Sequence, residues 1–246
     1  MGVLFSLIYY STAVVSSKPF SYSPPVGSYT TLSISDVDGL VSIIPWSQPS
    51  ILINGTLTAK GLGSSLSSIV LGNSSSDGTV AFKANFPTSS GILFSQTFTA
   101  AINVYIPSAE RFASIEVSNV NGGVQLENIN STGTTVTTVN GNVLLNCQYC
   151  VNATALSTNG NVTGTFSTLV NGGNYNLTAL NDNINFTAPN SSSIHLSAKV
   201  LNGSIYCYMT QCPHTTYQGE STLAFGTGEA DASLNSINGQ ITITGT

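Results

Sequence analysis

The chain has 246 residues, and only 6% of them are charged, with ten acids and five bases giving a net charge of -5. The charges are scattered singly and form no basic stripe, which excludes nucleic acid as a partner. Hydrophobic residues make up 41% of the sequence, too many for a disordered chain, and at this length one β-rich body is expected.

The first seventeen residues form an uncharged run rich in β-branched and aromatic side chains. The first positive charge, Lys18, follows this run, whereas a secretory signal has its basic residues in front of the apolar stretch, so a removed leader is not expected. The run is also shorter than the roughly 20 apolar residues that a membrane helix needs. It is predicted to form an extended strand with both faces apolar. This strand is carried by Val3, Phe5, Leu7, Tyr9, Ala13 and Val15.

Three prolines follow at Pro19, Pro24 and Pro25, and proline hinders continuation into a regular ladder. We therefore predict an N-terminal donor strand over 1–17, a proline-rich hinge over 18–27 and a β-rich head domain over 28–246. An apolar strand on a hinge either becomes the first strand of its own domain or completes the sheet of a neighbouring copy. The leading hypothesis is the second. It describes a homopolymer in which each subunit inserts its strand into a groove of the next, head to tail.

The head is predicted to consist of strands joined by tight turns. Asp38-Gly39 lies between two short apolar alternations, and residues 92–106 alternate up to Pro107. In the second half, turns recur about every 20 residues, at Asn121, Asn140, Asn159, Asn181 and Asn202. Asn-Gly tolerates the positive φ angles of hairpin turns. We therefore predict an all-β fold, an antiparallel hairpin-rich sandwich or flattened barrel with an extended N-terminal donor strand. The alternative is a β-solenoid built from stacked units.

Nine Asn-x-Ser/Thr acceptors for N-linked glycans occur along the chain, several of them in or beside predicted turns, where a sugar can stand in solvent. Glycosylation of these sites would fix an extracellular location. The acceptors are Asn54, Asn73, Asn130, Asn152, Asn161, Asn176, Asn185, Asn190 and Asn202.

Four cysteines form two close pairs, Cys147 with Cys150 and Cys207 with Cys212. Four thiolates can bind zinc, but neither pair has the surrounding pattern of a zinc knuckle, and no metal site is predicted. Disulfides fit a surface protein better. The sequence leaves three connectivities open, and the turn in front of each pair favours pairing within it.

No catalytic residue and no cofactor are predicted, so the chain is not expected to be an enzyme. The close acids Asp36 and Asp38 flank a turn, and a polysaccharide lyase that used them would be the enzymatic alternative. His195 and His214 have no nucleophile and acid at a recognisable spacing. Trp46 is interpreted as a core or groove-rim residue rather than a sugar-stacking platform.

The scarcity of carboxylates also bears on acid stability. A carboxylate whose pKa is depressed in the folded state contributes stability that is lost as the pH falls. With ten acids in the chain, little stability of this kind can be lost, and we expect the protein to remain folded in strong acid.

Two resemblances accompany these patterns. The stretch from Val104 to Pro107 and on through Ser114 to Val124, with the later Asn-Gly turns, resembles the adhesin repeat domains of many surface proteins. The whole chain, with its apolar arm, acceptor sites and charge-poor body, resembles the subunit of the archaeal thread, a glycosylated filament of acid-loving thermophiles. That resemblance implies donor strand complementation, an extracellular cell-surface filament and a role in adhesion or biofilm formation, with other cell surfaces as partners. The alternative is a monomeric or membrane-tethered adhesin or glycan-binding protein.

Overall fold

The structure is a computed structural model that describes residues 15–25, 27–61, 64–87, 96–212, 217–218, 221–225 and 228–246. The described chain is built of strands, with one short 3-10 helix, η1 (Leu66–Ser68). The predicted all-β class is confirmed. None of the helical structure in these described ranges is long and apolar enough to cross a membrane.

The strands are numbered in chain order. They are β1 (Val15–Tyr22), β2 (Thr31–Ser35), β3 (Val41–Trp46), β4 (Leu52–Lys60), β5 (Val70–Ser76), β6 (Thr79–Asn85), β7 (Thr97–Pro107), β8 (Phe112–Asn121), β9 (Val124–Asn140), β10 (Val143–Asn159), β11 (Val162–Phe166), β12 (Leu169–Ala179), β13 (Ile184–Ala188), β14 (Ile194–Cys207), β15 (Tyr217–Gln218), β16 (Ser221–Phe225) and β17 (Ala230–Gly245).

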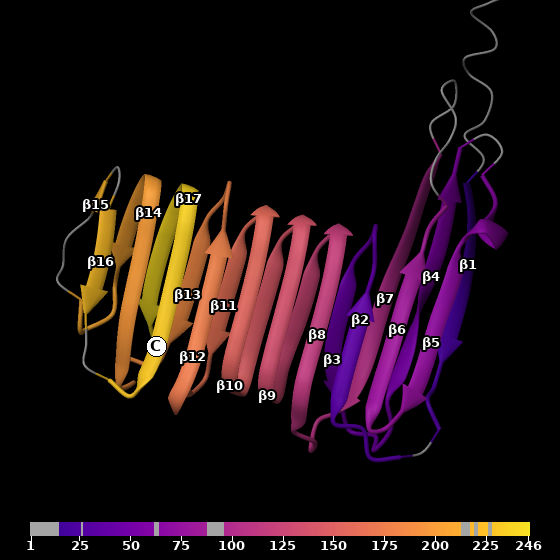
Figure 1. Ribbon diagram of the computed structural model, residues 1–246, viewed down its shortest axis with the longest axis horizontal. Helices are drawn as coiled ribbons and strands as arrows, with labels where there is room; N and C mark the ends of the chain where they lie inside the picture. Colours follow the sequence, from indigo (N-terminus) through magenta and orange to yellow (C-terminus); the bar gives the residue numbers. More distant parts are fainter. Residues whose placement is uncertain are drawn as a thin grey trace, which may run out of the picture.

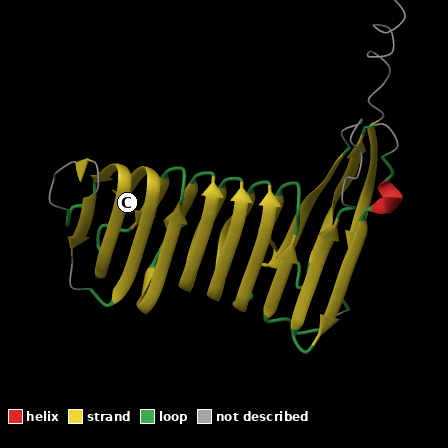
Figure 2. Ribbon diagram, turned by 45° about the horizontal axis from the view of Figure 1, so that its top comes forward, coloured by secondary structure: helices red, strands yellow, loops and turns green. Residues whose placement is uncertain are grey.

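The strands stack into two layers that face each other across one core (Figures 1 and 2). Strand β9 shows how the chain builds them. Its first residues, 124–126, pair in parallel with β3, and after a bend its residues 131–140 pair in parallel with β8. The next long strand, β10, repeats the same path beside β9. We call one such passage through both layers a rung.

The pairings give the order of the strands in each layer. Layer 1 runs β1, β4, β7, β3, the first halves of β9 and β10, β11, β13, the second halves of β17 and β14, and β15. Layer 2 runs β5, β6, β2, β8, the second halves of β9 and β10, β12, the first halves of β17 and β14, and β16. The middle of the stack is parallel, and antiparallel pairs lie at its two ends.

This pairing corrects the expectation of hairpins. The Asp38-Gly39 turn joins β2 to β3, but β2 pairs with β6 and β8, while β3 pairs with β7 and β9. The strands on either side of each Asn-Gly turn belong to opposite layers, so the turn connects layers instead of neighbouring strands. Between two parallel neighbours in one layer, the chain passes through the opposite layer, which provides the crossover connection that parallel strands require. The β-solenoid alternative therefore describes the parallel stack.

The core consists of inward-facing side chains at alternate positions in both layers. On β9, Val124 and Leu126 from layer 1 and Val136 from layer 2 are fully buried, and β10 repeats the pattern with Val143 and Leu145. Alternation of this kind is the β period of two. One continuous hydrophobic cluster results along the stack.

The final rung is assembled out of chain order. Strand β17, the last strand described, pairs with β12 and β13 on one side and with β14 on the other. It therefore lies between two segments that precede it in the sequence (Figure 1). The even spacing of Asn181 and Asn202 did not predict this insertion.

The N-terminal boundaries also differ from the prediction. Val15 pairs with Lys60, and β1 continues antiparallel to β4 as far as Tyr22. Residues 18–22 of the predicted hinge, and Val15 of the predicted donor strand, thus belong to the head's own layer 1. Pro19 is tolerated there because β1 is an edge strand, where a missing N–H breaks no inner ladder. The other donor-strand residues, Val3, Phe5, Leu7, Tyr9 and Ala13, lie outside the described residues, and their role stays a prediction.

Candidate functional site

One long edge of the stack carries a continuous row of asparagine amides. It follows the turns at the ends of β8, β9 and β10, whose arrowheads line one edge in Figure 1. Six asparagines take part and make five hydrogen bonds of 2.7 to 2.9 Å, in which the amide nitrogen of each residue after the first donates to the side-chain oxygen of the residue before it. We call this row the asparagine ladder. In spatial order it is Asn121, Asn140, Asn159, Asn181, Asn238 and Asn202.

The ladder explains why asparagine recurs at these turns. Parallel strands place equivalent residues about 4.8 Å apart, a spacing that lets one amide bond the next. Neighbouring rungs also approach each other so closely that the residue after Asn140 and the residue after Asn159 have no room for a side chain. A Cβ on Gly141 would meet the backbone of Gly122, and one on Gly160 would meet that of Gly141. Asn-Gly is therefore selected here by stacking contacts between rungs and not by hairpin geometry.

Two further rows of hydrogen bonds run beside the ladder. On its layer 1 side, the side-chain oxygens of Asn142, Asn161 and Asn183 each accept a backbone N–H from the next rung. On the inner side, a buried polar residue donates to a turn carbonyl of the adjacent rung. Thr138 Oγ1 donates to Gly122 O over 3.0 Å. At the next rung, Ser157 donates to a turn carbonyl in the same way, and at the preceding rung Asn119 does so through its amide nitrogen.

Asp36 occupies this inner row in the rung formed by β2 and β3. The register of β2 on β8 places it beside Asn119, and its side chain is only 2% exposed. Oδ1 accepts the N–H of Val37 over 2.8 Å, whereas Oδ2 is buried and has no hydrogen-bond partner among the described residues. Burial raises the pKa of Asp36 to about 7, against the lowering effect of the backbone N–H groups of Val37 and Asp38. Burial also raises the pKa of Asp38.

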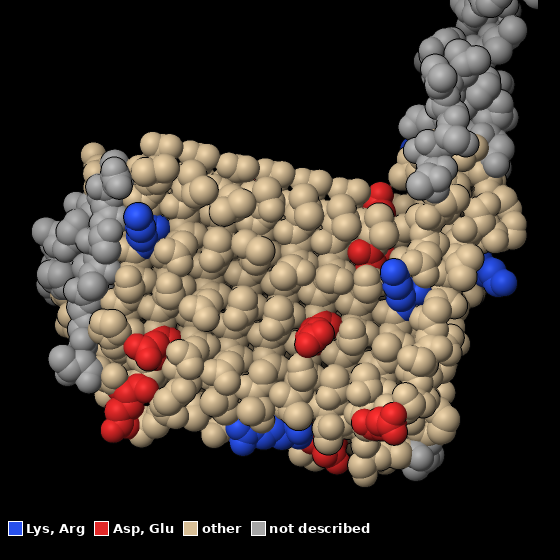
Figure 3. All heavy atoms as spheres, in the orientation of Figure 1, with Lys and Arg blue, Asp and Glu red and all other residues tan. Residues whose placement is uncertain are grey.

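An exposed hydrophobic row runs along layer 2, one residue before the ladder. Its members are between 36% and 42% exposed, and at the same position Thr158 and Leu180 are half-buried. The layer 2 face carries few charged side chains, and these are scattered (Figure 3). A repetitive surface of this kind with few charges is a candidate interaction site. We call it the apolar row, and it consists of Val37, Val120, Val139, Ile237 and Leu201.

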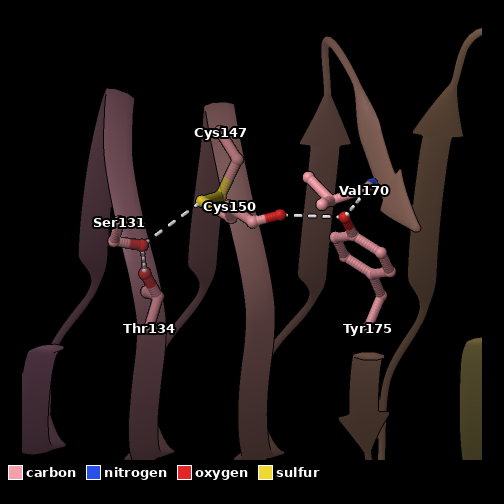
Figure 4. Close-up of a disulfide and its surroundings, with 6 residues drawn as sticks. All are labelled: Ser131, Thr134, Cys147, Cys150, Val170 and Tyr175. Atoms are coloured by element: carbon pink, nitrogen blue, oxygen red, sulfur yellow. Dashed lines mark hydrogen bonds between the residues drawn. A yellow bond between two sulfur atoms is a disulfide. The ribbon is translucent and has the colours of Figure 1, made fainter. Parts of the chain in front are cut away.

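The opposite edge of the stack is held by the Cys147–Cys150 disulfide, at the bend of β10 between the layers (Figure 4). Ser131 on β9 donates to Cys150 Sγ over 3.6 Å. The hydroxyl of Tyr175 donates to Cys150 O and accepts the N–H of Val170, both over 2.8 Å. Burial raises the pKa of Tyr175, so this hydroxyl stays protonated. The second disulfide joins Cys207 to Cys212, and the local pairing favoured from the sequence is confirmed for both.

The glycan acceptors fall into distinct environments. Asn161 and Asn190 lie between strands, in line with the expectation that several acceptors lie in or beside turns, and the other seven acceptors lie within strands. Four acceptors already use their side chains in hydrogen bonds: Asn152, Asn161, Asn190 and Asn202. Asn54 and Asn130 are half-buried. Asn73, Asn176 and Asn185 are exposed and make no side-chain hydrogen bond to the described residues. Asn176 and Asn185 alternate with buried residues and face outward, which leaves their amides open for a sugar, whereas Asn73 lies opposite the buried Phe82, on the inner face of β5.

The remaining candidates from the sequence do not converge on one site. His195 Nδ1 lies 3.1 Å from Asp231 Oδ1 in an exposed pair, and His214 is outside the described residues. Trp46 Nε1 donates to Ser50 O over 2.7 Å, and its ring packs on Tyr105 with centroids 5.4 Å apart. A nearby open cavity of about 400 Å³ is lined by four prolines, two aromatic residues and six others, among them Glu110 as its carboxylate. Asp36 and Asp38 lie at the opposite edge of the stack, at the ladder.

Comparison with known proteins rests on the fold. No family model matches the sequence, and no curated protein matches it. The structure is similar to that of a candidate cell adhesion protein from Clostridium sporogenes ATCC 15579, with a TM-score of 0.53, 11% identity, and coverage of 94% of this chain and 100% of that chain. A candidate adhesin from Bacteroides fragilis NCTC 9343 gives a TM-score of 0.35 at 10% identity, covering 92% and 97% of the two chains. One from Parabacteroides merdae ATCC 43184 gives 0.25 at 10%, covering 93% and 95%.

Proposed function

We propose that this protein is a non-catalytic, extracellular adhesive subunit that polymerises into a cell-surface filament. Each subunit inserts its N-terminal strand into the next, head to tail, and the polymer serves adhesion or biofilm formation. The likeness of the whole fold to the candidate cell adhesion protein of C. sporogenes supports the adhesive part of the proposal. The two disulfides support an oxidising, extracellular compartment.

The observation that carries the polymerisation proposal is the position of β1. The predicted apolar arm leads directly into Val15, at the start of an edge strand that closes one end of layer 1. An arm attached there begins at the end of the stack, where a neighbouring subunit in a linear polymer must lie. Main-chain pairing along such an arm gives affinity, and alternate side chains give specificity.

The adhesive surface in this proposal is the asparagine ladder together with the apolar row. Both repeat once per rung, so the surface presents the same amide and aliphatic groups at about 4.8 Å intervals. Its flatness and lack of charge suit an extended uncharged partner, such as a polysaccharide or a protein strand on another cell surface. This surface also favours the second candidate, a monomeric or tethered adhesin, which would use the same groups without polymerising.

The test is removal of residues 1–14, which leaves β1 whole. We expect wild-type protein to form filaments visible by negative-stain microscopy and the truncated protein to remain monomeric. Circular dichroism of both proteins is the control for folding. Filaments from the truncated protein at the wild-type yield would refute polymerisation through the arm, and monomeric wild-type protein that still binds surfaces would favour the second candidate.

A further inference from the structure

The two layers end unevenly at the N-terminal end of the stack. Beyond the rung formed by β2 and β3, layer 1 continues with three strands, β7, β4 and β1. Layer 2 continues with two, β6 and β5. Among the described strands, none pairs with the outer edge of β5. Layer 2 is thus one strand shorter than layer 1, and we call the place beside β5, across from β1, the open position.

Apolar side chains face this open position without a full cover. Phe20 and Tyr22 of β1 are half-buried, and their rings pack on Phe82 of β6 with centroids 5.5 and 6.3 Å apart. Leu71 of β5 is also half-buried and packs on the core. The burial of these three side chains is therefore incomplete. An additional strand beside β5 would complete that burial.

The edges that border the open position are protected to different degrees. Exposed edge strands usually carry lysine, proline or inward-pointing charges that prevent strand addition. Edge β1 carries Lys18 and Pro19. Edge β5, with the sequence Val-Leu-Gly-Asn-Ser-Ser-Ser, has no charged residue and no proline. The unprotected edge is therefore the one that adjoins the shorter layer.

We infer that the open position beside β5 receives residues 1–14 of another copy of this chain. The inference rests on the proposed function, because it names the surface that the arm fills. Fourteen extended residues span about 46 Å, against about 23 Å for the seven residues of β5. The arm is thus long enough to pair along all of β5 and still bridge to its own subunit. Its alternate apolar side chains cover Phe20, Tyr22 and Leu71.

A charge placed on the inner face of β5 tests the inference. Asn73 lies opposite the buried Phe82, so its exposed side chain is on the face that borders the core. We expect Asn73→Lys in the full chain to lower filament yield at least tenfold, measured by sedimentation and negative-stain microscopy. Asn73→Gln removes the glycan acceptor without adding charge, and Ser74→Lys adds the same charge to the opposite face. Both controls are expected to assemble like the wild type.

Crosslinking identifies the occupant directly. The native cysteines are paired, so Ser75→Cys, on the inner face of β5, can be combined in turn with Phe5→Cys, Leu7→Cys or Tyr9→Cys. We expect at least one combination to give a ladder of covalent oligomers on non-reducing gels, and Ser74→Cys to give none. A crosslink within one chain would overturn the inference. So would normal filaments from Asn73→Lys in a protein that fails to assemble without residues 1–14, a result that leaves the proposed function intact.

Discussion

Replacing Asp36 with asparagine should stabilise the protein at neutral and alkaline pH. In the inner row beside the ladder, Asn119 donates an amide N–H to Gly39 O, a carbonyl of the next rung, over 2.7 Å. The corresponding carbonyl for Asp36 is that of Ala100, which adjoins Gly39 as Gly39 adjoins Gly122. Only a protonated Asp36 can donate there. The amide introduced by Asp36→Asn would supply a donor at every pH.

The magnitude follows from the raised pKa. The pKa of Asp36 rises from 3.8 to about 7 on folding, a difference of roughly three units or about 4 kcal/mol at about 1.4 kcal/mol per unit. The folded state binds the proton of Asp36 more tightly than the unfolded state does. Protonation of Asp36 therefore contributes stability that is fully present below the pKa of the unfolded state. It is lost as the pH rises from about 4 through about 7. At pH 8 the free energy of unfolding of the Asp36→Asn variant should therefore be about 4 kcal/mol higher than that of the wild type.

Thermal unfolding at pH 4 and pH 8 measures this difference. For a chain of this size, about 4 kcal/mol corresponds to a shift of roughly 8 to 16 °C in Tm. We expect the wild type to melt lower at pH 8 than at pH 4, and the variant to lose most of that difference. Asp77→Asn, an exposed turn substitution, is the matched control and should keep the wild-type pH dependence. An Asp36→Asn protein that is less stable than the wild type at pH 8 would refute the reasoning.

Three further predictions concern the turn glycines, a disulfide and the glycan acceptors. Gly141→Ala should lower the free energy of unfolding in urea by about 1 to 3 kcal/mol, because the added Cβ meets the neighbouring rung. Gly133→Ala, whose Cβ would make an ordinary contact at 3.5 Å, should be nearly neutral. Equal effects of the two substitutions would contradict close stacking at the turns. Cys147→Ser should lower the free energy of unfolding by about 2 kcal/mol through loss of a short loop closure, and an unchanged urea midpoint would argue against it. In protein from a glycosylating host, Asn185→Gln should remove one glycan mass in intact-mass spectrometry. Asn161→Gln should remove none, since the side-chain oxygen of Asn161 already accepts the N–H of Asn183 on the next rung.

The sequence predicted the β class because apolar residues alternate along β7, β8 and β10, and this alternation survives in the burial of Val104, Val117 and Leu145. The recurring turns were also found. Their meaning was missed, because Asn-Gly satisfies a hairpin and a solenoid turn equally well. The deciding contact, Asn140 to Asn121, joins residues 19 positions apart, and a local turn rule does not include such pairs.

For a related reason, the sequence predicted neither the burial of Asp36 nor the insertion of β17. Asp36 was interpreted as a residue that flanks a turn, since nothing local indicates that the rung of β8 covers it. The repeat spacing ended at Asn202, while Asn238 fills the place between Asn181 and Asn202. Both features depend on which distant strands become neighbours. The carboxylate that was expected to matter little in acid is instead a group that favours the folded state at low pH.

The insertion of β17 sets a constraint on biosynthesis. Residues Ala230–Gly245 separate β14 from β12 and β13, so β14 cannot take its native neighbours until these residues have left the ribosome. Synthesis proceeds from the N-terminus, and the earlier rungs can form as they emerge. Completion of the fold thereby waits for the synthesis of β17, and a nascent product truncated before Ala230 keeps an unsealed end.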